Sequence, residues 1–585
     1  MSKLYKSIPY VAVALAVYAF YAFAYGATLQ YGEQYQLFQS TTGYFLGLLA
    51  RPGGLAMYVG RFLTQFFIIP LVGAIFISML STGIFACVLR LSKSSKYGCQ
   101  MAVLVALLSA CILLDRQTLL NGLVCISIGC FILLLINSIK NDRLVAALLP
   151  IIVFATYWIA DGIPAAIVAG YVLCNYFVAQ KDKSLLVSAL ISLLIVVASP
   201  FMARQLFGVQ LNATRAFLGA DYSRYVIFLP TLPIVIGCLL AFLPIIDKLL
   251  NSNFLQKFDK PSRHFSISSV TVWILAFSVV SAVFASNVDF NTNRKCAIEY
   301  NVRTQNWKKA VEIADNEQEI DALTMSYINL ALAKTNRLGE KMFAYKQIGS
   351  LGLIPDFETD SDVSMALSEI YYHLGFINFA ERFAFEAAKA SPDYQESVRA
   401  VKRLAETNII KKNYPLARKY LAMLENTTFY AKWAQKCRRA IDSNRTDENA
   451  EWAQLRSFRN ASDYYYTERE KDAMLFDKFS MNQNNRLAYE YLMTFYLLNK
   501  DIEHFMQYAE YGGRFYGIAF PRAFREAAIF HLRMTNPEAV KDFGTADRLM
   551  LDKFYEFGKI YNANHHDSRL AARFGDTYWF YLFNE

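Results

Sequence analysis

The chain has 585 residues, 55% of them hydrophobic, with 59 Lys and Arg against 49 Asp and Glu. Residues 1–289 hold 19 of these cations and nine of the acids, which leaves 40 of each for residues 290–585, so the whole net charge of +10 belongs to the first part. A balanced second part argues against nucleic-acid binding, which needs a basic patch.

Nine apolar runs divide the first part, and we interpret residues 1–289 as a polytopic bundle of about nine transmembrane helices. Several runs are shorter than the ~20 residues that a perpendicular span needs, so one or two are alternatively re-entrant. The expected fold class is therefore all-α. The runs cover about 8–25, 66–89, 101–114, 119–139, 144–159, 163–179, 185–201, 225–246 and 267–286.

Charges in the connecting loops orient this bundle. With the N-terminus in the cytoplasm, inner loops carry 13 Lys and Arg and outer loops carry six, in keeping with the positive-inside rule. An odd number of spans then places residues 290–585 on the outer side. We therefore expect a multi-pass protein of a bacterial inner membrane with a periplasmic C-terminal domain.

The outer loops combine arginines with carboxylates near the membrane. Arginine offers a planar, bidentate fork for phosphate, and a carboxylate can deprotonate an acceptor. Alternatively, these are the polar residues of short loops, paired with one another. The residues are Arg51, Arg61, Arg116, Arg204, Arg215 and Arg224, with Glu33, Asp115, Asp161 and Asp221.

The first outer loop, residues 26–65, is too polar at its start to span the membrane and too apolar later to be solvated. Its apolar residues recur at helical spacing from Tyr35 to Leu48, and Pro52-Gly53-Gly54 then separates a second short amphipathic piece. We expect two short helices on the outer membrane surface, the first of which contains Glu33.

This layout resembles the GT-C glycosyltransferases: a first span, a long outer loop with a carboxylate near its start, two membrane-surface helices and further spans. The resemblance implies transfer of a sugar or glycan from a polyprenyl-phosphate or pyrophosphate carrier at the outer face, with Glu33 as the loop carboxylate. It implies supporting roles for Asp161 and Asp115 in catalysis. The six outer arginines are the donor-phosphate candidates, and the acceptor-binding candidates are Tyr157, Trp158 and Asp221.

No metal or cofactor motif accompanies these residues. Many GT-C members carry an acid pair in the first loop, whereas this loop has the single acid Glu33, so a divalent metal has no motif to hold it. Asp360-Ser361-Asp362 is interpreted as a surface loop, and His565-His566-Asp567 lacks a third ligand.

Residues 290–585 show helical pairs and are interpreted as a soluble α-solenoid. In the clearest unit, Leu367, Tyr371, Gly375, Ala380, Ala387 and Pro392 fall at the spacings of a tetratricopeptide repeat. Such repeats bind peptides or proteins on their concave face, and a spacer is the alternative. The aromatic tail at 577–581 is similar to that of uncharacterised Bacteroidota membrane proteins and indicates no function.

Three functions follow from these features. The first is a membrane glycosyltransferase that transfers a glycan from a polyprenyl-linked donor to an acceptor, which the repeat domain suggests is a protein. The second is a non-catalytic membrane scaffold whose repeats recruit partners for envelope assembly. The third, a transporter, is disfavoured because the interiors of the spans lack acids.

Overall fold

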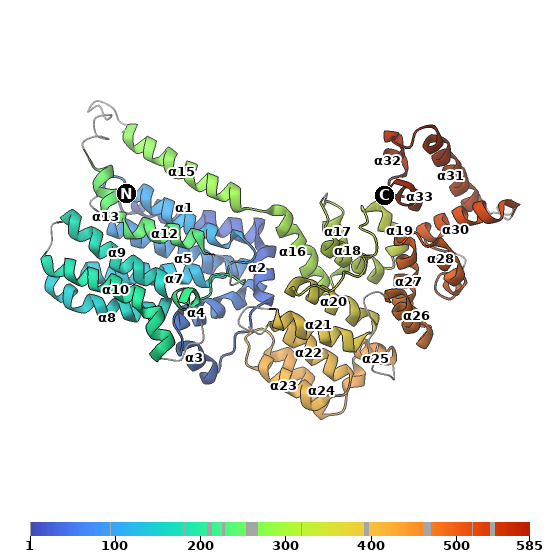
Figure 1. The fold of residues 1–585 in the computed structure, drawn as a ribbon, viewed down its shortest axis with the longest axis horizontal. Coiled ribbons are helices and arrows are strands. Elements are labelled where there is room, and N and C mark those ends of the chain that lie inside the picture. Colours follow the sequence, from blue (N-terminus) through green and yellow to red (C-terminus); the bar gives the residue numbers. More distant parts are fainter. Residues whose placement is uncertain are drawn as a thin grey trace. The chain divides into compact units, whose positions relative to one another are not determined.

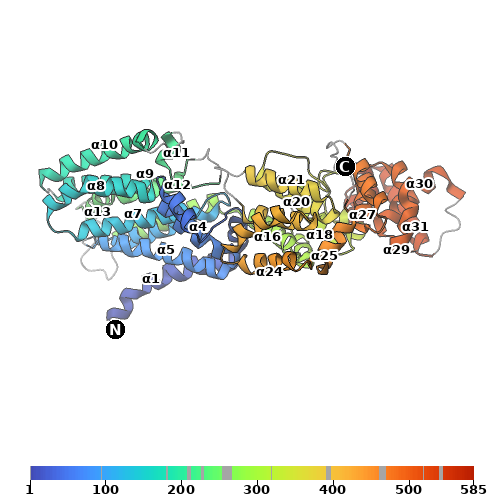
Figure 2. The same cartoon turned by 90° about the horizontal axis from the view of Figure 1, so that it is seen from below.

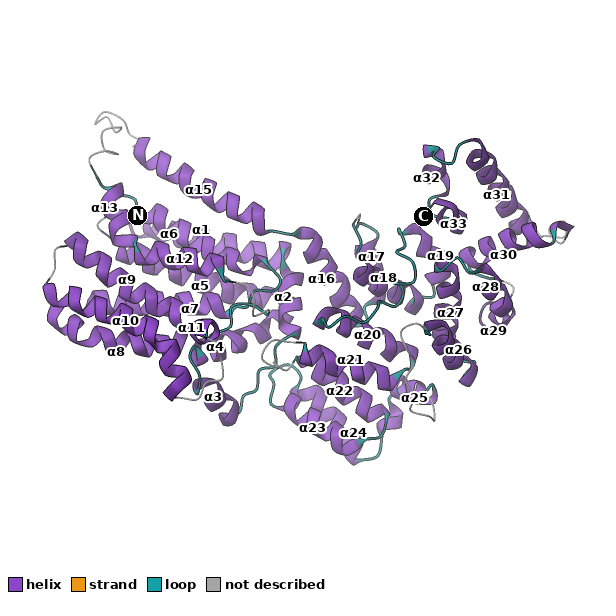
Figure 3. Ribbon diagram, viewed as in Figure 1, coloured by secondary structure: helices purple, strands orange, loops and turns teal. Residues whose placement is uncertain are grey.

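In the computed structural model, helices joined by loops and turns make up the residues described, and there is no strand among them (Figure 3). The all-α prediction is therefore confirmed at this level. The described residues are 2–93, 95–179, 182–206, 213–224, 229–252, 267–317, 319–390, 397–459, 470–517, 519–538 and 545–584. Outside them lie residues 225–228 of the eighth apolar run, Pro392, and the inner-loop cations Lys181, Lys257, Lys260 and Arg263.

The chain forms two compact units. Unit 1 contains Met1–Asn293 together with two later segments, Ser391–Val398 and Asn426–Ala431. Unit 2 contains the remainder of residues 294–585. The sequence places the division between residues 289 and 290, and it does not indicate that the two later segments pack with unit 1.

Unit 1 is a helical bundle in which α5 and α7 to α10 run side by side in both views (Figures 1 and 2). Large apolar side chains such as Leu15, Phe131 and Leu194 are exposed on its helices, as a lipid-facing surface requires. The helices in its apolar runs are α1 (Ser2–Ala19), α5 (Pro70–Leu91), α6 (Gly98–Ala110), α7 (Asn121–Ser138), α8 (Asp142–Ala160), α9 (Gly162–Ala179), α10 (Lys183–Leu206), α12 (Thr231–Ala241), α13 (Leu243–Leu250) and α15 (Ile267–Asn287).

Seven helices in the described residues are long and apolar enough to cross a membrane. An eighth span results if α12 and α13, which are bent by 61°, form one broken helix. Pro244 at the start of α13 explains the break, because proline cannot continue the hydrogen bonds of α12. The remaining run is the shorter apolar helix Gly98–Leu114, so the count of nine stays a prediction.

The first outer loop contains three short helices rather than the two predicted: α2 (Gly26–Gln34), α3 (Thr42–Leu49) and α4 (Gly54–Thr64). A π-helical turn, Phe20–Ala24, connects α1 to α2. The hydroxyl groups of Tyr21 and Tyr25 donate to the carbonyls of Ala110 (2.6 Å) and Leu114 (2.9 Å), which fixes the start of α2 against the end of α6. Glu33 lies on α2, and non-helical residues separate α2 from α3.

Unit 2 is a series of helices and helical pairs. They are α16 (Phe290–Arg303), α17 (Trp307–Ala314), α18 (Ala322–Lys334), α19 (Leu338–Lys341), α20 (Ser361–Leu374), α21 (Ile377–Lys389), α22 (Val398–Ile410), α23 (Tyr414–Glu425), α24 (Ala431–Asp442), α25 (Ala450–Ser457), α26 (Lys471–Met481), α27 (Arg486–Leu498), α28 (Ile502–Ala509), α29 (Gly513–Tyr516), α30 (Arg522–Thr535), α31 (Thr545–Ala563), α32 (Ser568–Phe574) and α33 (Tyr578–Asn584). The first residues of α16 and Val398 belong to unit 1.

The clearest predicted repeat is the pair α20–α21. Gly375 ends α20 with φ +89°, a left-handed conformation that glycine adopts without strain, and the chain then turns into α21. Ser368 donates to the carbonyl of Ala380 at 2.7 Å, so small residues hold the two helices close together. The helical pair is present, and its assignment as a tetratricopeptide repeat stays a prediction.

Candidate functional site

Glu33 is a buried carboxylate near the C-terminal end of α2. It is 4% exposed, and its Oε1 accepts a hydrogen bond of 2.8 Å from the hydroxyl of Tyr430. Tyr430 belongs to the segment Asn426–Ala431 of unit 1. Residues two apart on a helix point in nearly opposite directions, so Glu33 and Tyr31 face different sides of α2.

A small cavity of about 10 Å³ lies beside Glu33, the size that accommodates one water molecule. Its wall includes the amide of Gln36, a side chain that is 6% exposed. Neither the nitrogen nor the oxygen of this amide has a hydrogen-bond partner among the described residues. Buried polar atoms are normally paired, so this amide points to a polar group that binds here. The full lining is Glu33, Gln36, Leu37, Phe38, Arg61, Gln65, Val398, Thr427, Phe429 and Tyr430.

Arg61 on α4 brings a positive charge to the same cavity. Its guanidinium is buried, with the residue 8% exposed, and Nη1 donates to the hydroxyl of Tyr44 at 3.1 Å. Within the described part of the chain, Nε has no hydrogen-bond partner and the guanidinium has no ion-pair partner. A buried cation is costly without a counter-charge, so Arg61 is suited to an anionic group entering from the cavity.

Asp161 lies elsewhere, as the single residue between α8 and α9. It is fully buried, and its φ of +93° is rare for any residue other than glycine. Oδ1 accepts from the backbone of Ile163 and the hydroxyl of Tyr222, both at 3.0 Å, and Oδ2 accepts from the backbone of Ala220 at 3.4 Å. The bonds from Ala220 and Tyr222 attach the α8–α9 turn to the segment at 220–222, and the bond from Ile163 caps the start of α9. None of the three involves Glu33.

The same segment joins the first outer loop. Arg51 Nη2 lies 3.3 Å from Oδ2 of Asp221, and both side chains are mostly buried. Gly53 has φ +73°, and a Cβ at this position would lie 2.5 Å from the backbone nitrogen of Ala220. Asn121 donates to the carbonyls of Ala220 and Asp221 at 2.8 and 3.1 Å. Arg51 and Asp221 thus hold loops together.

Arg224 and Arg116 contact the opposite side of α2 from Glu33. The Arg224 guanidinium lies 3.4 Å from the ring centre of Tyr35 and donates to the hydroxyl of Tyr31. Arg116 lies 5.3 Å from the ring centre of Tyr31. Such cation–π contacts contribute to stabilising the two charges.

The remaining predicted residues are dispersed. Tyr157 is buried and donates to the carbonyl of Ala216 at 2.7 Å, and the Trp158 indole donates to that of Leu49 at 3.0 Å, so both act as ties between loops. Asp115 is exposed and caps a turn by accepting from the backbone of Gln117 at 2.9 Å. Arg204 is exposed at the end of α10, and Arg215 is half-buried on α11 (Ala213–Phe217).

Of the predicted site residues, the structure brings Glu33 and Arg61 to one cavity. It gathers Arg51, Asp161 and Asp221 around the segment at 220–222. The sequence interpretation missed Gln36 and Tyr430. For Gln36, its place three residues after Glu33 was an available signal, whereas nothing in the local sequence indicates that Tyr430 approaches Glu33.

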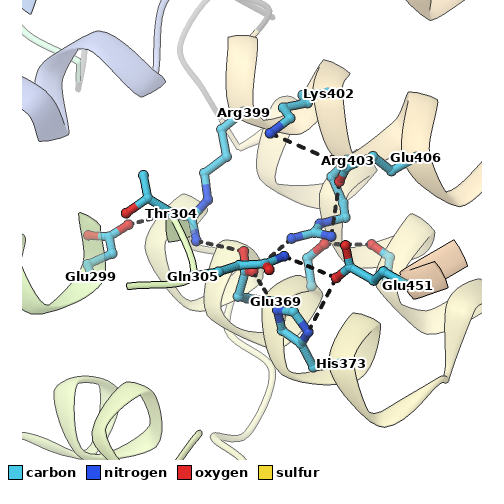
Figure 4. A network of polar contacts seen from close by, with 12 residues as sticks. Glu299, Thr304, Gln305, Glu369, His373, Arg399, Lys402, Arg403, Glu406 and Glu451 are labelled. Carbon is cyan, nitrogen blue, oxygen red and sulfur yellow. Dashed lines mark hydrogen bonds and ion pairs between the residues drawn. The ribbon is translucent and has the colours of Figure 1, made fainter. Parts of the chain in front are cut away.

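A second polar cluster lies in unit 2, around Glu369 of α20 (Figure 4). Glu369 is 2% exposed, with Arg403 Nη2 at 2.8 Å from Oε1 and Arg399 Nη2 at 3.4 Å from Oε2. His373 lies one turn further along, with Nε2 at 3.2 Å from Oε1. Arg399 also pairs with Glu299 of α16, so the cluster links α16, α20 and α22.

The protonation states in this cluster follow from burial and charge. Burial alone raises the pKa of Glu369, but Arg403, His373 and Arg399 together hold it well below the ordinary value. Burial lowers the pKa of His373 to about 4. At neutral pH the cluster therefore contains a carboxylate between two arginines and a neutral histidine, an arrangement that stabilises the packing of these helices.

The two motifs noted in the sequence have structural roles. Asp360-Ser361-Asp362 is not a surface loop, because Ser361 and Asp362 are buried in the first turn of α20. Asp360 accepts from the backbone of Asp362 and Val363 and caps α20, and Asp567 accepts from the backbone of Arg569 and caps α32. Among the described residues, no group of three or more His, Cys, Asp or Glu is placed to hold a metal ion.

The model of a family of unknown function (DUF6057) matches residues 2–585. No curated protein and no solved structure matches the chain.

Proposed function

The chain belongs to the DUF6057 family, and we propose from the geometry around Glu33 that it is a membrane glycosyltransferase of the GT-C type. It transfers a sugar or glycan from a polyprenyl-phosphate or pyrophosphate carrier to an acceptor, a protein, at the periplasmic face of a bacterial inner membrane. The candidate membrane spans supply access to a lipid-linked donor, and the helical unit 2 supplies a surface for a protein acceptor.

The observation that carries this proposal is the convergence of three buried groups on one cavity. Glu33 provides a carboxylate, Gln36 an amide with both atoms unsatisfied among the described residues, and Arg61 a guanidinium with no counter-ion there. A base, a group that binds hydroxyls and a cation are the set that transfer from a phosphate carrier to a hydroxyl requires.

The proposed reaction moves one proton and exchanges one bond. Glu33 accepts the proton of the acceptor hydroxyl while the oxygen of that hydroxyl forms a bond to the anomeric carbon of the sugar. The bond from that carbon to the carrier phosphate breaks, and its electron pair remains on the phosphate. Arg61 stabilises the departing phosphate, because a guanidinium in a buried site interacts strongly with developing negative charge. Glu33 then releases its proton to water.

The other predicted acids and arginines are assigned differently by this proposal. Asp161 and Asp221 position the loops that face the first outer loop, and Arg51 supports Asp221. Arg204 and Arg215 stay candidates for the carrier's phosphates, since neither is buried.

A non-catalytic scaffold is the second candidate. The observation that favours it is the size of the cavity, about 10 Å³, together with the internal bonds of Asp161, Arg51 and Arg224. In a scaffold these hydrogen bonds and ion pairs stabilise the fold, and no cavity for a substrate is required.

Replacing Glu33 tests the proposal. We expect Glu33→Gln to keep normal membrane levels and to abolish glycosylation of envelope proteins, since glutamine preserves the shape and cannot accept the proton. Glu503→Gln, an exposed change on α28, is the control. Full glycosylation with Glu33→Gln contradicts the enzymatic proposal and favours the scaffold.

A further inference from the structure

The segment Asn426–Ala431 covers the Glu33 cavity. Thr427, Phe429 and Tyr430 of this segment line the cavity, opposite side chains of α2, α4 and the residues around them. The segment follows α23 and forms turns rather than a helix. With this cover in place the cavity holds no more than one water molecule, so a ligand reaches Glu33 only after the cover moves.

Hydrogen bonds and a ring contact join this segment, the cover, to the first outer loop. The backbone and side chain of Ser40 both donate to the carbonyl of Asn426, at 2.9 and 3.0 Å. The backbone of Thr428 donates to Gln65 Oε1 at 3.3 Å, and the ring of Phe429 meets that of Phe66 edge-on, with ring centres 5.5 Å apart. The Ser40 and Thr428 bonds are exposed to solvent, and water can replace them when they break.

The fourth contact is a hydrogen bond to the proposed general base, Glu33. The Tyr430 hydroxyl donates to Glu33 Oε1 at 2.8 Å, which is the bond that an acceptor hydroxyl makes to a general base. Gln36 and Arg61 line the same space and retain unsatisfied hydrogen-bonding groups among the described residues. If Tyr430 leaves, these groups and Glu33 can bind an incoming hydroxyl and the anion beside it.

We propose that Asn426–Ala431 is a gate over the Glu33 site and that the Tyr430 hydroxyl occupies the position of the acceptor hydroxyl while the gate is closed. The ligand admitted by opening is a side-chain hydroxyl of an acceptor protein. This inference rests on the proposed glycosyltransferase function for the identity of that ligand. The gate itself is a physical property that can be measured without any transfer reaction.

The gate is tested by locking it. The Ser40–Asn426 backbone bond brings the two positions close enough for a disulfide, so the double variant Ser40→Cys/Asn426→Cys fixes the gate when oxidised. The readout is the rate at which dicyclohexylcarbodiimide modifies Glu33 in the purified full-length protein, followed by mass spectrometry of the α2 peptide. The single variant Ser40→Cys is the control for the native cysteines.

We expect oxidation of the double variant to slow the modification of Glu33 at least tenfold and reduction to restore it. Equal rates in the oxidised and reduced protein overturn the gate. Because this readout requires no transfer, a gate that responds to oxidation stands even if Glu33→Gln leaves glycosylation intact, and the two proposals fail separately.

Tyr430→Phe tests the placeholder role. It removes the hydroxyl and keeps the ring, so we expect modification of Glu33 to accelerate several-fold. Tyr58→Phe, a nearby change on α4 that also removes a hydroxyl, leaves the rate of Glu33 modification unchanged. An unchanged rate in Tyr430→Phe overturns this role, because it shows that the hydroxyl does not cover Glu33.

Discussion

Replacing Glu369 with glutamine removes the negative charge from the centre of the buried cluster in unit 2. Arg403 and Arg399 then lose the carboxylate that lies 2.8 and 3.4 Å from them. Breaking a buried ion pair by removing one partner costs about 3–5 kcal/mol. Each arginine retains another carboxylate, Glu406 or Glu299, so the lower end, about 3 kcal/mol, applies here.

Hydrogen exchange of the full-length protein measures this cost where it arises. A loss of about 3 kcal/mol corresponds to exchange roughly 100-fold faster in amides that open with α20 and α22, since 1.4 kcal/mol is a factor of ten. Glu312→Gln is the control, because the Lys309–Glu312 pair is exposed and contributes little. Exchange within threefold of wild type in α20 and α22 refutes the view that Glu369 stabilises these helices.

Three further predictions concern pH, a glycine and the α8–α9 turn. Between pH 6.5 and 4 the unfolded chain binds a proton at His373 that the folded chain does not. The free energy of unfolding of unit 2 therefore falls by about 1.4 kcal/mol per pH unit on acidification. We expect His373→Gln to weaken the fall in Tm between pH 6.5 and 5. Gly53→Ala lowers the Tm in detergent through a cost of about 2 kcal/mol, whereas Gly47→Ala, whose Cβ meets nothing within 4 Å, does not. Asp161→Ala removes the acceptor of three buried donors and costs about 3 kcal/mol or more, and Asp161→Asn costs less. Equal losses of folded protein in a thermal-stability assay contradict the hydrogen-bonding role.

Much of the helical architecture was predictable because it depends on local patterns. Long apolar runs give long helices, and Gly375 marks a turn because its left-handed conformation suits glycine. The break between α12 and α13 was missed, although Pro244 marks it. Counting spans from hydropathy fails where a helix is short or bent, as at Gly98–Leu114.

The candidate site was predictable only in part. Glu33 and Arg61 both lie in the predicted first outer loop, residues 26–65, so their proximity could be expected from their positions in the sequence. Tyr430 lies almost 400 residues further along the chain, and its bond to Glu33 depends on tertiary packing that no local pattern encodes. The resemblance to GT-C enzymes made Asp161 a supporting catalytic acid because it lies in an outer loop, yet its bonds to Ile163, Ala220 and Tyr222 account for its burial without catalysis.

The most direct test of glycan transfer is mass spectrometry of periplasmic glycoproteins and carrier-linked glycans from cells with and without the protein. Transfer predicts that, without the protein, glycopeptides disappear and the carrier-linked glycan accumulates. Wild-type protein reverses both changes, and Glu33→Gln reverses neither. Identical glycopeptide and carrier profiles with and without the protein contradict the proposed function.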